Sequence, residues 1–362
     1  MNIAVYEAPP SALQASDREM EIEVCKESER DLWDFYVEQN PSATISHIYG
    51  WRRIISEAYG HATYYLMAKR DSKVVGVLPL VLVKSRFFGS SLASMPFQDY
   101  GGILADDDIA ACALLDHALE LRREAGADCV ELRHRDSILE GKGLLRQDKV
   151  TLLLDISPGI ESLWQKFSGK VRNQVRKAEK SGLTTCIGGS ELIEDFYRVF
   201  AVNMRDLGSP VHHPGFFTQI FSEFGDRARL LIVRDGSRTI GGLIGLFFKD
   251  VMIVPWASSL REYFPKCPNN LLYWYAFQQG CDRGCKLFDF GRSSIGSGTY
   301  NFKLQWGAKP VQLNWQLFFR KNPSRPSTSE DWKLQAAAQV WSHLPVQLTL
   351  LLGPAIRKYL VN

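Results

Sequence analysis

The sequence predicts an α/β fold with mixed sheets, built as two tandem domains that are related by an internal duplication. Three observations support this prediction. The chain of 362 residues is too long for one ordinary hydrophobic core. Strand-like and helical segments follow one another in the same order in each half. The apolar segments 73–81 (KVVGVLPLV) and 238–246 (RTIGGLIGL) fall at matching points of the two halves.

The first half is expected to begin with a short strand and a pair of helices. A hairpin of two strands follows, joined by the turn Arg70-Asp71-Ser72. A loop, a long helix and a last strand close this half. The expected ranges are a strand at 21–24, helices at 29–38 and 47–59, hairpin strands at 64–69 and 73–83, a loop at 92–102, a helix near 107–125 and a strand at 128–132.

The second half repeats this plan, with an additional helical pair near its start. A strand is expected at 150–156, followed by helices at 160–167 and 170–180. The remaining expected elements are a strand at 183–187, helices at 191–207 and 215–224, strands at 228–234, 239–248 and 251–257, a helix at 269–283 and strands at 287–290 and 311–319. The domains therefore divide into an N-terminal one at 1–149, a C-terminal one at 150–320, and a linker with a helical tail at 321–362.

The composition is that of a folded, soluble protein, with 45% hydrophobic and 23% charged residues. A net charge of +3 is too small to indicate a nucleic-acid binder, although basic residues can still be concentrated locally. No apolar run is long enough for a membrane span, and residues 1–20 show no signal-peptide pattern, so a cytoplasmic location is expected. The seven cysteines are scattered without a set of four ligands, so we expect reduced thiols and no metal.

The most informative segment is 286–317, KLFDFGRSSIGSGTYNFKLQWGAKPVQLNWQL. A buried-looking strand ends at Gly291 and leads into a glycine-rich loop with several hydroxyl groups and the cation Arg292. Lys303 follows, at a position expected to enter the next strand. Loops of this kind, next to a buried strand, are where α/β folds usually bind ligands. The alternative is a solvated turn between two strands.

With these residues, the chain resembles the FemAB-like transferases, whose fold is a tandem pair of acetyltransferase-like (GNAT) domains. The resemblance covers most of residues 20–320. It is strongest at 169–182 (GKVRNQVRKAEKSG) and from 288–292 (FDFGR) to Phe302 and Lys303. More narrowly, the chain looks like the branch that accompanies exosortase and exopolysaccharide systems.

The resemblance implies an enzyme that forms an amide on an amine of a cell-envelope or exopolysaccharide precursor, such as peptidoglycan. The donor implied is aminoacyl-tRNA or a carrier-bound acyl group, and the acceptor is a glycan or lipid-linked precursor. By resemblance, Lys303 is the lysine that matters, and a cation there could stabilise the oxyanion of acyl transfer. Its alternative is a surface lysine at a strand edge. Arg292 could bind phosphate or anchor the loop through Asp289.

One departure from the wider superfamily concerns coenzyme A. Acyl-CoA-dependent members bind the pyrophosphate with a glycine-containing turn at a helix N-terminus. Here the corresponding segment, 256–270, has no glycine, and its prolines remove amide donors. We therefore expect no coenzyme A bound in the usual way, and no cofactor.

A basic helix is predicted at 170–180, with Val171, Val175 and Ala178 on one face. Five cations cover the rest of this helix, and a single acid, Glu179, offsets them. Either the face is merely solvated, or it binds a phosphate-rich partner such as tRNA or a lipid-linked pyrophosphate. The cations proposed to bind substrate are Lys170, Arg172, Arg176 and Lys177.

The loop PFQDYGG at 96–102 contributes two further candidates. Asp99 could accept the proton of the acceptor amine, or it could simply stabilise a turn. Tyr100 is expected to line a cleft between the halves, together with Arg292 and Tyr300. His212 and His213 have no accompanying nucleophile motif, so they are expected to cap the helix that begins near Gly215.

The tail at 332–360 mixes apolar and basic residues after a linker rich in proline and serine. It is either a helix packed on the body or a helix at the inner face of the membrane. Two functions remain as alternatives to the aminoacyltransferase. One is an N-acyltransferase that uses acyl carrier protein or acyl-CoA, and the other is a non-catalytic protein that binds nucleic acid or glycan.

Overall fold

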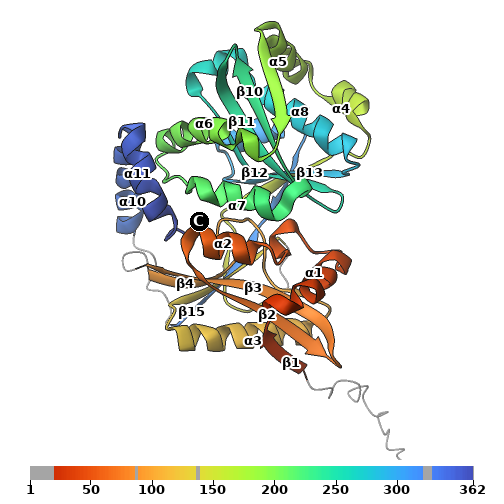
Figure 1. Cartoon of the computed structure of the whole chain (residues 1–362), viewed down its shortest axis with the longest axis vertical. Helices are drawn as coiled ribbons and strands as arrows, with labels where there is room; N and C mark the ends of the chain where they lie inside the picture. The colour runs from red at the N-terminus through yellow and green to blue at the C-terminus, as the bar shows by residue number, and fades with distance from the viewer. Residues whose placement is uncertain (1–19, 86–88, 136–138, 321–327, 362) are drawn as a thin grey trace, which may run out of the picture.

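The computed structural model describes residues 20–85, 89–135, 139–320 and 328–361. They form two mixed β-sheets, one above the other, with helices on both faces of each (Figure 1). The first sheet has the order β1-β2-β3-β4-β6-β15-β7, and the short β5 pairs with β3. The second has the order β14-β8-β13-β12-β11-β10-β9.

The strands of the first sheet come mainly from the first half of the chain. The β2–β3 hairpin was predicted, and its turn residues Asp71 and Ser72 have φ of 51° and 62°, as a tight type I′ turn requires. The strands are β1 (Met20–Val24), β2 (Ala62–Arg70), β3 (Lys73–Ser85), β4 (Gly89–Ser94), β5 (Leu104–Ala105), β6 (Cys129–His134), β7 (Leu144–Arg146) and β15 (Asn314–Phe319).

The second sheet repeats this arrangement. In both sheets four antiparallel strands lead to one parallel pair, which is β4–β6 in the first and β12–β13 in the second. β3 and β11, which contain the two similar segments of the sequence, occupy the same position in their sheets. The strands are β8 (Val150–Asp155), β9 (Leu183–Gly188), β10 (Ala228–Asp235), β11 (Arg238–Phe248), β12 (Val251–Ser259), β13 (Leu287–Ser293) and β14 (Lys309–Gln312).

The second half sends its last strand, β15, into the sheet of the first half. β8 lies between β13 and β14, and β15 lies between β6 and β7, all in antiparallel pairs. The predicted second domain, 150–320, therefore includes a strand that completes the first sheet. Main-chain hydrogen bonds in the first sheet thus join the two halves, and that sheet is complete only with a strand from the second half.

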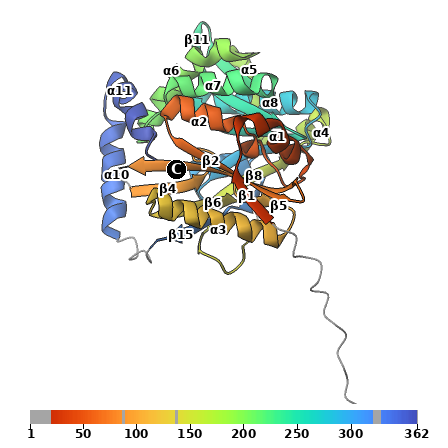
Figure 2. The same ribbon diagram turned by 60° about the horizontal axis from the view of Figure 1, so that its bottom comes forward.

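The helices form three layers, outside each sheet and between the sheets (Figures 1 and 2). α3 covers the outer face of the first sheet, and α5 and α8 cover that of the second. The helices are α1 (Arg30–Gln39), α2 (Trp51–Tyr59), α3 (Asp108–Ala125), α4 (Ile160–Lys166), α5 (Gly169–Lys180), α6 (Ile193–Asp206), α7 (Pro214–Phe224), α8 (Pro268–Asp282), α9 (Gly298–Leu304), α10 (Thr328–Ser342) and α11 (Val346–Arg357).

The layer between the sheets is a hydrophobic core shared by both halves. It packs α1 and α2 against α6 and α7, and it contains the fully buried Trp33, Trp51 and Phe216. Trp51 meets Phe224 edge-on, with ring centroids 5.0 Å apart. Both indole N–H groups have carbonyl partners, because Trp33 donates to His47 and Trp51 donates to Ile45. This shared core fixes the position of one half against the other.

Two predictions about the segment 286–317 were wrong. Lys303 lies in a short helix, α9, rather than at the entry to a strand, because the Ser297 side chain caps a helix in the loop by accepting from the Tyr300 amide at 3.2 Å. The strand expected at 311–319 is divided at Leu313 into β14 and β15, which belong to different sheets.

The C-terminal tail beyond 327 forms α10 and α11 against the side of the molecule (Figures 1 and 2). α11 packs on α6, with Thr349 and Gly353 buried. A side chain at 353 would approach the Val211 amide nitrogen to 3.0 Å, so glycine permits this contact. The opposite face exposes Leu351 by 74%. Among the described helices, none is both long enough and apolar enough to cross a membrane.

Candidate active site

A cavity of about 280 Å³ opens where β12 and β13 separate. The two strands pair only from Val251 with Leu287 to Ile253 with Asp289. Beyond this point a bulge in β13 brings Gly291 into the wall with φ of +70°, a conformation that glycine adopts without strain. Loop 95–101 from the first half, α6 and the end of α11 form the remaining walls. The cavity thus lies between the two halves.

Lys303 reaches this cavity from α9 and is only 6% exposed. Its Nζ donates to the carbonyl oxygens of Gly291 at 2.8 Å and Arg292 at 3.0 Å. Within the described part of the chain these are its two hydrogen bonds. Since an ammonium group has three N–H donors, one remains for a ligand.

Burial lowers the pKa of Lys303 to about 8, because a charged ammonium is less stable away from water. The nearby Asp99 and Asp289 carboxylates oppose this shift, and Arg292 adds to it. The side chain is therefore still largely protonated at pH 7. A buried, charged lysine with a lowered pKa is typical of functional sites.

Asp99 and Arg292 form an ion pair across the two halves. The Asp99 Oδ1 lies 3.2 Å from Arg292 Nε, and its Oδ2 accepts from the Arg292 main-chain amide at 2.9 Å. Arg292 also lies over the Trp315 ring, 5.3 Å from its centroid. Both members of the pair line the cavity. Arg292 is thus anchored by Asp99, and not by Asp289 as one alternative proposed.

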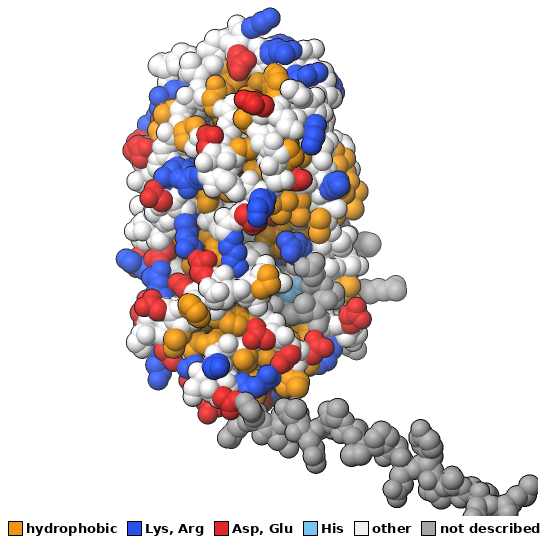
Figure 3. All heavy atoms as spheres, turned by 90° about the vertical axis from the view of Figure 1, so that its right-hand side faces the viewer, with side chains coloured by type: hydrophobic (Ala, Val, Ile, Leu, Met, Phe, Trp, Pro, Cys, Tyr) orange, Lys and Arg blue, Asp and Glu red, His pale blue; other side chains and the backbone are white. Residues whose placement is uncertain are grey.

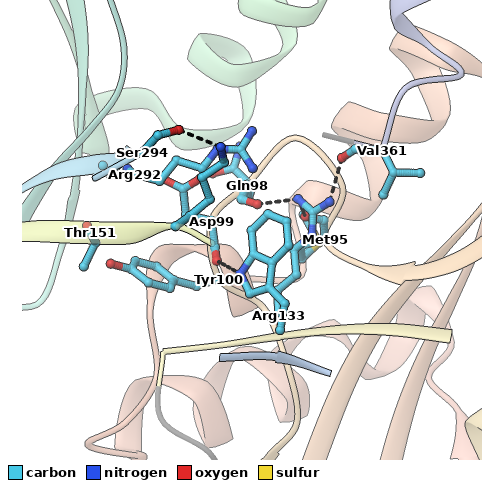
Figure 4. A network of polar contacts seen from close by, with 12 residues as sticks. Met95, Gln98, Asp99, Tyr100, Arg133, Thr151, Arg292, Ser294 and Val361 are labelled. Atoms are coloured by element: carbon cyan, nitrogen blue, oxygen red, sulfur yellow. Dashed lines mark hydrogen bonds and ion pairs between the residues drawn. The ribbon is translucent and has the colours of Figure 1, made fainter. Parts of the chain in front are cut away.

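The loop that presents Asp99 is held in an unusual conformation. Met95 and Phe97 both have positive φ, 49° and 71°, which is a strained geometry for these residue types. The buried guanidinium of Arg133 holds the loop by donating to the carbonyl of Gln98 at 2.6 Å (Figure 4). Arg133 is balanced by Glu131, at 2.7 Å.

Tyr100 lies behind the cavity. Its hydroxyl donates to Asp289 Oδ2 at 2.6 Å, and Thr151 donates to Asp289 Oδ1 at 2.6 Å. Burial raises the pKa of Asp289, against the lowering effect of these bonds. Tyr100 and Asp289 line a second, smaller cavity of about 90 Å³. The structure therefore separates Tyr100 from the Lys303 cavity.

The other predicted residues are distributed as follows. Tyr300 lies on α9 and packs, partly buried, against the core of the second sheet. Four of the five cations of α5 are exposed and Arg172 is half-buried, while Val171, Val175 and Ala178 are buried as predicted. Cationic side chains gather at the upper end of the molecule in Figure 3, where Figure 1 places α5. These cations do not line the Lys303 cavity.

The structure adds residues that sequence reasoning missed, above all Arg357, His212 and Gln98, which line the same cavity. Arg357 lies at the end of α11 in the tail, which had no predicted place near the site. His213 caps α7, as predicted, by accepting from the Gly215 amide at 3.0 Å. His212 instead lines the cavity. Its hydrogen-bond partner, the Tyr59 hydroxyl, is 153 residues away in the sequence.

Comparison with known proteins agrees with this architecture. Residues 165–304 match the acetyltransferase (GNAT) domain model. FemX is similar over 81% of this chain and 96% of its own, with a TM-score of 0.62 and 15% identity. A tandem GNAT protein from the clavulanic acid biosynthesis pathway covers 84% of this chain and 100% of its own, with a TM-score of 0.53 and 13% identity.

A third similar structure is the C-terminal domain of a putative lysylphosphatidylglycerol synthetase from Agrobacterium fabrum, with a TM-score of 0.54 and 11% identity. It covers 86% of this chain and 96% of its own. A search of curated proteins gave no match. Because the sequence identities are low, these similar structures establish the fold alone. It consists of two GNAT-like domains in tandem, as predicted. The GNAT match supports an acyltransferase, and hence an enzyme.

Proposed function

We propose that the protein transfers an aminoacyl or acyl group to an amine of a cell-envelope or exopolysaccharide precursor, forming an amide. The observation that carries this proposal is the cavity in which the buried cation Lys303 and the carboxylate Asp99, one from each half, face the same space. The resemblance to the FemAB-like transferases supports the substrate class, and FemX is one of the similar structures. The name of another, a putative lysylphosphatidylglycerol synthetase, supports it too, because it describes a lipid that carries an aminoacyl group.

The chemistry assigns a role to each group. The acceptor amine attacks the carbonyl carbon of the donor ester, a C–N bond forms, and the carbonyl oxygen becomes an oxyanion. The free N–H of Lys303 donates to this oxyanion, a stabilisation typical of acyl transfer. Asp99 accepts the proton that the amine loses. When the intermediate collapses, the bond to the donor oxygen of aminoacyl-tRNA, or to the sulfur of a thioester carrier, breaks and that atom takes up the proton.

The donor we propose is aminoacyl-tRNA or a carrier-bound acyl group. The strand-to-helix segment at 256–270 supports this choice, because α8 begins with Pro268 and the preceding Cys267 makes no side-chain cap. The proline removes one of the amide donors that would otherwise face a pyrophosphate. The exposed cations of α5 offer a surface for a phosphate-rich carrier.

A charge-reversal experiment tests this surface. Replacing Arg172 and Arg176 by glutamate is expected to weaken donor binding by roughly 10-fold or more, because two phosphate contacts become repulsive. Thermal stability should change little. Arg176 lies over the Trp164 ring at 5.4 Å, a contact that contributes about 0.5–1 kcal/mol at exposed sites. Binding is measured against ionic strength, and the wild type should show the steeper salt dependence.

The matched control is a double variant on the first domain, Lys73→Glu with Arg123→Glu, which makes the same change in net charge. If both double variants bind the donor equally weakly, the loss of affinity is due to the change in overall charge. If the α5 variant binds as the wild type does, this helix has only a solvated face.

The proposed reaction is tested by a transfer assay with the purified protein. Aminoacyl-tRNA, acyl carrier protein and acyl-CoA, each with a labelled acyl group, are incubated separately with extracted envelope precursors. The expected product carries label that resists mild base, as an amide does and an ester does not. Absence of transfer from all three donors would contradict the proposal, and mass spectrometry of precursors from cells with and without the protein would then identify any other modification.

A further inference from the structure

The C-terminal helix α11 forms one wall of the Lys303 cavity through Arg357. The Arg357 guanidinium lies 5.3 Å from the centroid of the Phe97 ring, and its Nε donates to His212 Nε2 at 3.2 Å. Phe97 belongs to the same strained loop as Asp99. A residue near the end of the chain thus packs directly on the loop that carries the predicted base.

The imidazole ring of His212 is neutral, and it positions the Arg357 guanidinium. Burial, together with the charge of Arg357, holds the pKa of His212 well below its ordinary value. Its Nε2 accepts from Arg357, so Nδ1 carries the proton and donates to the Tyr59 hydroxyl, 2.5 Å away. Tyr59 comes from α2 and His212 precedes α7, so the support for Arg357 comes from both halves.

The chain beyond Arg357 is also fixed in place. The Val361 carbonyl accepts from Arg133 Nη2 at 2.6 Å, which is the guanidinium that also holds Gln98 (Figure 4). His61 Nε2 lies 2.7 Å from the carbonyl oxygen of Lys358. These contacts hold the chain that follows Arg357, and the packing of α11 on α6 holds the chain before it, so the arginine has a defined position in the cavity wall.

The lining of the cavity has an excess of positive charge. Arg292, Lys303 and Arg357 line it, and Asp99 is the one acid among its lining residues. Gln98 also lines it and is 2% exposed, and its Nε2 has no hydrogen-bond partner. A buried amide without a partner is costly, so such a group indicates a ligand that completes its hydrogen bonds.

We propose that Arg357 and Gln98 bind an oxyanion group, a carboxylate or a phosphate, of one substrate. The charge of the Arg357 guanidinium attracts either group, and the Gln98 amide provides a hydrogen-bond donor beside it. The C-terminal helix is then part of the binding site, and the tail is required for substrate affinity. This inference rests on the proposed function only in taking this cavity as the active site.

Binding of small anions tests the inference without turnover. Inorganic phosphate and succinate are titrated separately by calorimetry, at constant ionic strength, into the full-length wild type and the variants Arg357→Gln and Gln98→Glu. Both variants are expected to weaken binding of the preferred anion by roughly 10- to 100-fold, because each loses or opposes a charge-assisted hydrogen bond. Arg357→Lys should restore part of it. The stronger of the two probes identifies phosphate or carboxylate.

Arg238→Gln, which changes an arginine paired with Glu262 on the surface, is the control for loss of one positive charge. Because Arg357 is half-buried and packed against Phe97 and His212, its variant could fail to fold. Gln98→Glu then decides alone, since the Gln98 amide nitrogen has no internal bond to lose. Wild-type affinity in the folded variants, or no binding of either anion to the wild type, would overturn the inference. The reaction itself would stand, because it is tested through Lys303.

Discussion

Replacing Lys303 by alanine is expected to reduce kcat by roughly 100- to 1,000-fold, the usual cost of losing one oxyanion donor. The KM for either substrate should change much less, because the ammonium contacts charge that develops only in the transition state. The basis is the position of Nζ, which uses two N–H groups on the carbonyls of Gly291 and Arg292 and directs the lysine to the cavity. Steady-state kinetics at saturating donor measure the effect.

The conservative variant Lys303→Arg should recover only part of the rate, because a planar guanidinium places its donors differently from an ammonium. Lys309→Ala, which changes an exposed lysine on β14, is the matched control and should leave kcat unchanged. A Lys303→Ala enzyme with near-normal kcat would end the catalytic assignment. Circular dichroism of the variant distinguishes lost chemistry from lost structure, since this lysine is buried.

The lowered pKa of Lys303 gives a pH dependence with a definite sign. The protonated form is the active one in the proposed mechanism, and it is lost as the pH rises through about 8. The rate at saturating substrate should therefore fall on the alkaline side, above about pH 8. In Lys303→Arg this alkaline decrease should move to higher pH, because arginine stays charged. An unchanged profile in that variant would assign the decrease to another group.

Much of the fold follows from local patterns that the sequence contains. The β2–β3 hairpin was predicted from its polar turn at 70–72, and the buried face of α5 was predicted from the spacing of Val171, Val175 and Ala178. The insertion of β15 into the first sheet was not predicted. Which strand lies beside which depends on pairings between residues far apart in the chain, and periodicity does not contain this information.

The helix α9 shows why the local sequence pattern around Lys303 gave a wrong prediction of secondary structure. The sequence at 296–305, GSGTYNFKLQ, contains glycine, small polar and aromatic residues, which are poor helix formers, so a loop and a strand were expected. A single serine cap and tertiary packing outweigh those propensities. Lys303 was nevertheless chosen through resemblance and lies in the cavity.

Arg357, His212 and Gln98 carry no motif that would mark them in the sequence. They converge because the tail packs on α6 and because both halves contribute to one core. Arg357 lies 145 residues from His212, and Gln98 comes from a loop of the other half. Only the three-dimensional arrangement brings these groups to one cavity. The cations of α5 were predicted from composition, and their role stays a prediction.

Replacing Asp99 by asparagine is expected to lower kcat by roughly 100- to 10,000-fold if its carboxylate accepts the proton of the acceptor amine. The carboxylate also holds Arg292, at 3.2 Å from Nε, so a loss of rate alone would not separate catalysis from positioning. Arg292→Gln removes the partner and keeps the carboxylate. If Asp99 acts only through Arg292, the two variants and their double should lose the same rate.

If Asp99 is the base, its variant should lose far more than Arg292→Gln. Added formate should then restore part of the activity of Asp99→Ala, because the smaller side chain leaves space for a carboxylate in the cavity. Formate should have no effect on Lys303→Ala, which retains its base and lacks the cation. Equal losses in Asp99→Asn and Arg292→Gln, with no rescue by formate, would make Asp99 a positioning residue. The acceptor amine would then have to lose its proton to water or to the leaving group.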